Sequence, residues 1–214
     1  MSIEARFSSI VHPSLAKQKL HIFGCGAIGS NVAIHSDKMG IKKFTLYDFD
    51  KVEQPNLGVS PYGMKDIGAL KVDALKSLLN PLCDVKIHDD KIDEDTKLKG
   101  LKNAIAVLAF DNMEARLMVA KKICEAKAKL LIDGRMGAEM FQMYVLQKPK
   151  IKEYKKFWYS DEEGSEEPCT AKATPWCSSL TGSFISNALS KVISGHPCPT
   201  ELFFHFPSMT MDWK

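Results

Sequence analysis

The stretch LHIFGCGAIGS, residues 20–30, decides the fold class. A short apolar run, LHIF (20–23), leads into a glycine-rich turn, GCGAIGS (24–30), and then into NVAIHSDKMG (31–40), which has the spacing of a helix. A strand, a tight turn and a helix N-terminus in this order form a loop that holds phosphates, because backbone amides and the helix dipole face the anion. The stretch therefore predicts nucleotide binding, and leaves open whether the nucleotide is a redox dinucleotide or ATP.

Each glycine of this loop has its own expected role. The first lets the strand turn tightly, the second lets backbone amides approach a phosphate, and the third lets the helix pack close to the strand. The residues expected to form the phosphate loop are Gly24, Gly26, Ala27, Ile28 and Gly29.

Strand-like and helix-like segments alternate along the rest of the chain. Strands are predicted at 43–50, 84–90, 104–110, 129–134, 141–147 and 201–206, and helices at 66–79, 111–127 and 176–194. This order predicts a Rossmann-like α/β fold, with a mostly parallel sheet and helices on both faces. The strand at 141–147 begins a C-terminal antiparallel extension. We expect one domain over residues 1–214, with a long crossover loop at 148–175 that shows little periodicity.

Composition excludes several classes of protein. The chain has 214 residues, 45% of them hydrophobic, and a net charge of +3 from 29 basic and 26 acidic residues. This balance does not favour nucleic acid or a membrane surface as a partner. The six cysteines form no C-x-x-C pair, so neither a structural zinc site nor a disulfide framework is expected. The N-terminus lacks the apolar segment of a signal peptide, and the expected location is cytoplasmic.

Two pairs of features favour ATP over a dinucleotide. Asp48 and Asp50 lie two residues apart at a predicted strand end, so both are expected on one side, where the first can bind ribose and the second can lie near a metal–triphosphate. The alternative is a charged strand exit. On the helix predicted at 66–79, Lys71 falls within an apolar stripe that includes Ile67 and Ala74. We expect it to meet a phosphate, although its stem can also reach solvent.

The second pair lies further along the chain. Asp111 follows the apolar strand at 104–110 and is placed to hold Mg²⁺, a cation that prefers oxygen ligands; alternatively it caps the next helix, with Glu114 completing a capping box. Cys169, in PCTAKATPWC (168–177), is a candidate nucleophile. Cys177 is the rival, because Thr174 is expected to cap the following helix and the dipole of its first turn lowers a thiol pKa.

Taken together, GCGAIG, DFDKVEQPNL, DIGALK, DN-x-x-AR and PCTAKATP resemble the ubiquitin-activating-enzyme superfamily, the ThiF/MoeB/HesA group, and in particular a short phage- or plasmid-type branch. The resemblance implies that Asp48 binds ribose, that Asn56 and Lys71 lie at the nucleotide, and that Asp111 binds magnesium. It also implies that Cys169 forms a thioester. Asp50 matches the family acid two residues after the ribose-binding aspartate.

The chain departs from the family at its arginines. Val59 and Ser60 stand where the family has arginine and glutamine, and Ser9 replaces an arginine near the N-terminus. Only three arginines remain, namely Arg6, Arg116 and Arg135, against 26 lysines. Arg135, expected just after a strand end, is the candidate replacement for the lost phosphate contact.

The resemblance implies ATP-dependent adenylation of the C-terminal glycine of a ubiquitin-like or sulfur-carrier protein, followed in some members by transfer to a cysteine. ATP and Mg²⁺ are the expected cofactors, and a homodimer is the expected assembly. The alternatives are a nucleotide-binding scaffold that has lost turnover, an adenylating dehydratase for small molecules, and an NAD(P)-dependent oxidoreductase. The oxidoreductase leaves Lys71, Asp111 and the cysteine segment without a role.

Overall fold

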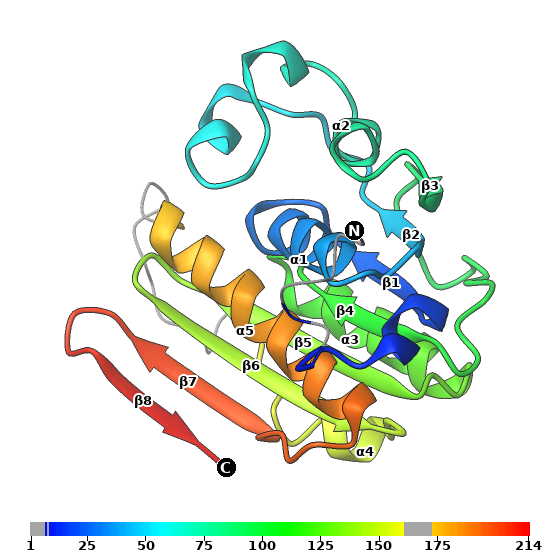
Figure 1. Ribbon diagram of the computed structural model, residues 1–214, viewed down its shortest axis with the longest axis vertical. Coiled ribbons are helices and arrows are strands. Elements are labelled where there is room, and N and C mark those ends of the chain that lie inside the picture. The colour runs from blue at the N-terminus through cyan, green and yellow to red at the C-terminus, as the bar shows by residue number, and fades with distance from the viewer. Residues whose placement is uncertain (1–6, 8, 161–172) are drawn as a thin grey trace.

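The computed structural model describes residue 7 and residues 9–160 and 173–214, which form one eight-stranded sheet flanked by helices (Figure 1). The strands are β1 (Lys19–Phe23), β2 (Lys43–Tyr47), β3 (Asp84–His88), β4 (Ile105–Leu108), β5 (Leu130–Met136), β6 (Met140–Gln147), β7 (Glu201–His205) and β8 (Thr210–Trp213). The helices are α1 (Ala27–Lys38), α2 (Lys71–Leu78), α3 (Met113–Glu125), α4 (Ile151–Tyr154) and α5 (Pro175–Ser194).

The strand order is β3-β2-β1-β4-β5-β6-β7-β8. The first five strands in this order, β3, β2, β1, β4 and β5, are parallel. Strands β6, β7 and β8 continue the sheet in antiparallel fashion. The chain moves outward from β1 to β3 and then returns to place β4 on the other side of β1. Ligands of such sheets bind at this reversal, outside the carboxyl ends of the strands. The topology confirms the predicted fold class.

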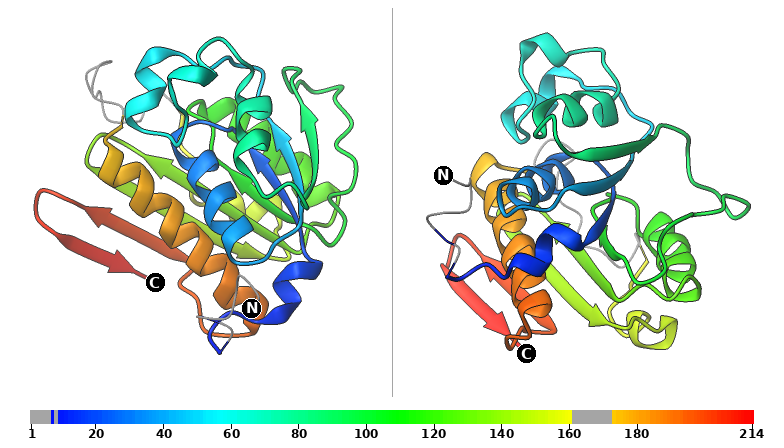
Figure 2. Two further views of the ribbon diagram at one scale, coloured as in Figure 1. Left: turned by 45° about the horizontal axis from the view of Figure 1, so that its top comes forward. Right: turned by 45° about the vertical axis from the view of Figure 1, so that its right-hand side comes forward.

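Side chains of the central strands alternate between two cores. On β4, Ile105 and Val107 pack with α1, α2 and α5, whereas Ala106 and Leu108 pack with α3 and α4. All four are fully buried, as expected for parallel strands covered on both faces. Figure 2 shows the two helical layers on opposite sides of the sheet. Helices therefore cover both faces, as predicted.

Several predicted boundaries are wrong. The helix expected at 66–79 begins only at Lys71, and Ile67 lies before it with 43% of its surface exposed. Strand β5 continues through Arg135, which the sequence placed after its end. The crossover segment contains α4, and β8 follows the strand expected to be the last. The predicted helix cap is confirmed, because the Thr174 side chain accepts a hydrogen bond from the amide of Cys177.

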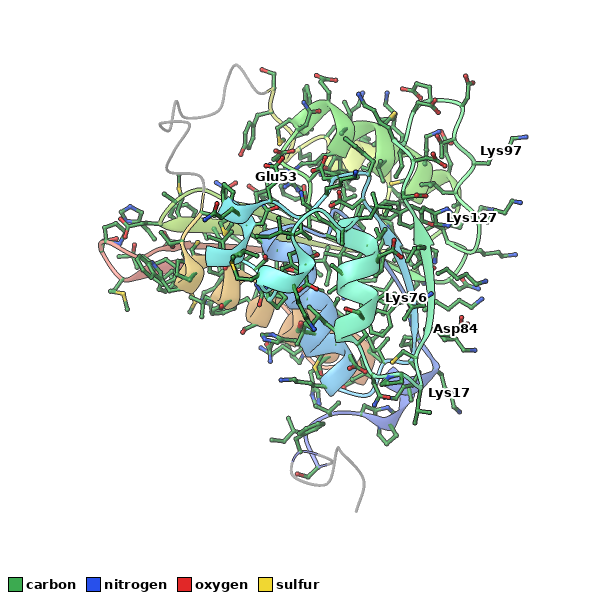
Figure 3. All side chains as sticks on the ribbon, turned by 90° about the horizontal axis from the view of Figure 1, so that it is seen from above. Lys17, Glu53, Lys76, Asp84, Lys97 and Lys127 are labelled. Atoms are coloured by element: carbon green, nitrogen blue, oxygen red, sulfur yellow. The ribbon has the colours of Figure 1, made fainter. Side chains whose placement is uncertain are left out.

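Charged side chains lie mostly at the periphery. Figure 3 shows Lys17, Lys97 and Lys127 projecting outward on one side of the molecule, the side where Asp84 begins β3. Within the described part of the chain, no helix is long and apolar enough to cross a membrane.

A buried histidine should make stability depend on pH. His21 of β1 is 2% exposed, and its Nδ1 lies 3.2 Å from the Tyr47 hydroxyl. Burial lowers the pKa of His21 from 6.5 to about 4, although a hydrogen bond to Gly100 partly opposes the shift. Between these values the unfolded chain binds the proton and the folded chain does not. The free energy of unfolding should therefore fall by up to about 3 kcal/mol as the pH drops from 6.5 to 4.

Chemical denaturation at several pH values measures this loss. His21→Gln should flatten the profile in that range, whereas the exposed control His196→Gln should keep it. If the free energy of unfolding of the His21 variant changed with pH as steeply as that of the wild type, other groups would cause the pH dependence.

Candidate nucleotide site

A cavity of about 570 Å³ opens at the carboxyl ends of β1, β2 and β4. It lies at the reversal of strand order, where a ligand is expected. Ten residues predicted for the site line it, although they come from six separate segments: Gly24, Gly26, Ala27, Ile28, Asp48, Asp50, Asn56, Lys71, Asp111 and Arg135.

The three glycines of the loop have the local environments that their predicted roles require. Gly24 turns the chain with a φ of +95°, in the region that favours glycine. A Cβ on Gly29 would lie 1.8 Å from the Gly24 carbonyl oxygen, so α1 can start this close to β1 only with glycine there. A Cβ on Gly26 would meet nothing within 4 Å, which leaves open space in front of the N-terminus of α1.

Asp48 connects the end of β2 to the glycine loop. Its carboxylate oxygens accept hydrogen bonds from the amides of Cys25, at 2.6 Å, and Asp50, at 2.9 Å. Burial raises the pKa of the Asp48 carboxyl, and the two amide bonds only partly oppose this effect. β2 ends at Tyr47, so strand alternation does not place Asp48 and Asp50, contrary to the reason given by the sequence. These local hydrogen bonds direct Asp48 instead.

Lys71 is fixed by Asp50 through both its backbone and its side chain. Its amide donates to the Asp50 carbonyl over 2.9 Å, and its Nζ donates to the Asp50 carboxylate over 2.8 Å. The side chain of Lys71 is 12% exposed and that of Asp50 is 52% exposed. Burial disfavours the charged amine, but the hydrogen bond to Asp50 and the charges of nearby aspartates outweigh it, so the pKa of Lys71 is raised. The amine is therefore a cation at the cavity wall.

Tyr62 joins these two parts of the site. Its hydroxyl donates to the Cys25 carbonyl over 2.5 Å and lies 3.3 Å from the Lys71 carbonyl oxygen. The glycine loop and the start of α2 are thus held together by one buried side chain. The sequence analysis did not identify Tyr62, and no pattern around it signals this role.

Asp111 lies at the exposed rim of the cavity. The residue that caps α3 is Asn112, whose side chain accepts from the amide of Ala115 over 2.8 Å, so the alternative that Asp111 is the cap is wrong. No group of three or more His, Cys, Asp or Glu side chains in the described ranges could enclose a metal ion. The carboxylates of Asp111 and Asp50 nevertheless fit Mg²⁺, which takes few protein ligands when phosphates and water supply the others.

A short 3-10 helix, Gln54–Gly58, supplies another part of the wall. Asn56 lines the cavity, and its side chain oxygen also accepts from the amide of Glu53 over 2.9 Å. Val59, at the position where the resemblance leads us to expect arginine, lines the same cavity. The position is therefore at the site, and it contributes an apolar side chain there.

The inner wall contains an ionic cluster that the sequence revealed only in part. Asp133 is completely buried and binds both Arg116 and Arg135. The guanidinium of Arg135 also lies 4.6 Å from the ring centre of Tyr144 and 5.0 Å from that of Tyr159. Arg135 is therefore held inside β5 rather than projecting from a strand end. The sequence signals for Arg116 were the scarcity of arginine and its place in the DN-x-x-AR motif, and nothing indicated Asp133.

Only one of the two candidate nucleophiles belongs to the part of the chain that the structure describes. Cys169 lies outside that part. Cys177 is completely buried in the first turn of α5, and its thiol donates to the Met140 carbonyl over 3.4 Å. Since a nucleophile must reach its substrate, this arrangement does not favour Cys177.

Comparison with known proteins identifies a family and a shared fold. A model of the ThiF family matches residues 5–214. Ubiquitin-like modifier-activating enzyme 5 of Caenorhabditis briggsae is 32% identical over 113 residues, 46% of this chain and 26% of that protein. Ubiquitin-like modifier-activating enzyme 1 of Rattus norvegicus is 25% identical over 154 residues, 63% of this chain and 14% of that protein. The chain thus spans about a quarter or less of these relatives.

Among solved structures, the microcin C7 biosynthetic enzyme MccB, in complex with N-formylated MccA, superposes with a TM-score of 0.80 at 19% identity. The match covers 94% of this chain and 65% of MccB. MccB of E. coli with ATP gives a TM-score of 0.76 at 18% identity, with 94% and 64% covered. These likenesses establish the common fold.

Proposed function

The chain belongs to the ThiF family, and from this premise we propose that it uses ATP to adenylate the C-terminal carboxylate of a ubiquitin-like protein, sulfur-carrier protein or peptide. A carboxylate oxygen attacks the α-phosphorus of ATP, an acyl-adenylate forms, and pyrophosphate leaves. The relatives are named as activators of ubiquitin-like modifiers, and MccB has been solved both with ATP and with MccA. These similarities support the proposal.

One observation carries it: the phosphate loop, the ribose-type carboxylate and a cationic amine line a single cavity. A dinucleotide enzyme needs the first two but has no use for the cationic amine of Lys71 at the cavity wall. An enzyme that transfers a nucleotidyl group needs aligned reactants and neutralised phosphate charge. The charged amine of Lys71 can meet the second need.

The proposed role of each residue follows from its position in the cavity. The amides of Gly26, Ala27 and Ile28 are proposed to receive phosphate oxygens at the N-terminus of α1. Asp48 would bind the ribose hydroxyls, while Asn56 contributes a polar group from the opposite wall. Lys71 would exchange its bond to the half-exposed Asp50 for one to phosphate. Asp111 would hold Mg²⁺, helped by Asp50 of the same cavity, and the ion would supply charge neutralisation on the leaving pyrophosphate.

One further step and one assembly are proposed from the family resemblance. The thiolate of Cys169 would attack the acyl-adenylate, so that a thioester forms and AMP leaves. A conjugate that resists cleavage by thiol reagents would contradict this step. We also propose a homodimer, which analytical ultracentrifugation would test.

A second candidate function is nucleotide binding without turnover. Val59 places no cation on the cavity wall, and both arginines there already bind Asp133. A protein of this kind would bind Mg-ATP but fail to exchange pyrophosphate with any carboxylate donor.

Asp111→Ala provides the test. Magnesium-dependent ATP–pyrophosphate exchange, with a ubiquitin-like protein ending in glycine as donor, should fall at least about 100-fold because charge neutralisation on the phosphates is lost. The control Asp84→Ala removes an exposed carboxylate on β3 and should exchange as the wild type does. Normal exchange by the Asp111 variant would show that the metal assignment is wrong.

A further inference from the structure

The buried carboxylate of Asp133 gathers three side chains from three elements. Its Oδ2 accepts from Arg135 Nε at 3.0 Å, from Arg135 Nη2 at 2.7 Å and from the Tyr154 hydroxyl at 3.0 Å. Its Oδ1 accepts from Arg116 Nη1. Asp133 and Arg135 belong to β5, Arg116 to α3 and Tyr154 to α4, so one carboxylate sets the relative positions of all three.

The cluster contains one anion and two cations. Arg116 is 3% exposed and Arg135 is 5% exposed, while Asp133 and Tyr154 are fully buried. An unbalanced buried charge is costly, and ring faces compensate only a small part of it. Both arginines line the cavity, whereas Asp133 lies behind them. The surplus positive charge therefore faces the ligand side.

The donors of both guanidinium groups are only partly used. A guanidinium has five N–H donors. Besides the bonds to Asp133, Arg135 donates through Nη1 to the Phe157 carbonyl at 2.7 Å, and Arg116 donates through Nη2 to the Phe110 carbonyl. In the described part of the chain these bonds use three donors of Arg135 and two of Arg116. Each arginine therefore keeps donors while its orientation is fixed.

We propose that Asp133 is a positioning residue, which holds Arg116 and Arg135 side by side at the inner wall so that together they receive one anionic oxygen group of the reactants. This inference rests on the proposed function and deepens it. The group is a carboxylate or a phosphate, which present similar oxygens to a guanidinium. The pair supplies the cationic contacts that Val59 and Ser9 cannot provide.

The test separates positioning from simple structural support. Removing Asp133 itself would leave two unpaired buried cations, and that variant is expected to unfold. Arg135→Lys keeps the charge but loses the planar fork, and Tyr154→Phe removes one bond to Asp133 without changing charge. Tyr47→Phe is the matched control, because it removes a buried hydroxyl that is bonded to His21 and comes from β2, three strands away from β5 in the sheet.

Titration calorimetry with Mg-ATP, and separately with a synthetic peptide ending in Gly-Gly carboxylate or its amide, measures the effect. Arg135→Lys should lower the affinity for one of the two anions at least about tenfold, since a lost charge-assisted contact changes affinity by that order. Tyr154→Phe should lower the affinity for the same anion severalfold, and Tyr47→Phe should leave that affinity unchanged. If affinity is lost only for Mg-ATP, the arginine pair binds a phosphate. If it is lost only for the peptide acid, with the amide unaffected, the pair binds a carboxylate.

The outcomes also separate this inference from the proposed function. Folded Arg135→Lys and Tyr154→Phe variants with wild-type affinity for both probes would overturn the positioning role while leaving adenylation intact. Weaker binding in these variants, with no exchange activity in the wild type, would support the role and overturn adenylation. A wild-type protein that binds neither probe would overturn both.

Discussion

Replacing Lys71 with alanine is expected to reduce ATP–pyrophosphate exchange at least about 100-fold, the usual cost of losing one charge-stabilising donor. The Nζ of Lys71 is an ammonium group on the cavity wall, and the raised pKa keeps it charged over the working pH range. Asp50, its partner, is 52% exposed and can be solvated when the lysine is absent. The thermal midpoint should therefore change little, because half-exposed ion pairs contribute little to stability.

Lys76→Ala is the matched control for this experiment. Lys76 is an exposed lysine on the same helix, α2, and its removal should leave both exchange and Mg-ATP affinity unchanged. Equal exchange by the Lys71 and Lys76 variants would remove the cationic amine from the mechanism.

Replacing Gly29 with alanine is expected to destabilise the fold by at least about 3 kcal/mol, at the upper end of overpacking effects. The added Cβ would lie 1.8 Å from the backbone oxygen of Gly24 and 3.0 Å from a side-chain carbon of Ile22. A carbonyl that belongs to the phosphate loop cannot move aside without displacing that loop. Chemical denaturation measures the loss, and circular dichroism reports whether the variant folds.

Gly26→Ala distinguishes crowding from the general cost of replacing glycine. Its Cβ would enter open space, and Gly26 is the N-cap of α1, where alanine is less favourable than glycine, so the free energy of unfolding should fall by only about 1 kcal/mol. Since that space faces the cavity, affinity for Mg-ATP should fall instead. If both variants lost the same stability, the close approach of α1 to β1 would not explain the need for Gly29.

The fold was predictable because its signals are local. The apolar runs of β1 and β4 are buried on both faces, and a strand, glycines and a helix in sequence specify the first turn. The antiparallel strand β6 was also expected. Strand β8 was missed although its sequence, TMDW, alternates polar and apolar residues, because a four-residue segment is too short for a clear pattern and neither of its faces is buried.

Lys71 shows how a correct location can follow from an incorrect reason. The sequence placed it at the centre of an apolar helix face, but α2 begins at Lys71 itself. Its position comes from long-range pairing with Asp50, reinforced by the bridge between Lys51 and Leu70. Helical periodicity cannot report such a contact, because the partner lies 21 residues away.

The cluster around Asp133 was the least predictable part of the site. Asp133 lies in the apolar strand β5, where a single acid gives no sign of its partners. Arg116 and Tyr154 reach it from helices on the same face of the sheet, 17 residues before it and 21 after it. Only the tertiary fold brings these groups together.

The most direct test of the central claim is a crystal structure with Mg²⁺ and a non-hydrolysable ATP analogue. The account predicts phosphate oxygens on the amides of residues 26–28, and Lys71 Nζ moved from Asp50 to a phosphate. A nucleotide bound elsewhere, or a Lys71 amine that stays on Asp50 or turns to solvent beside bound phosphates, would contradict it.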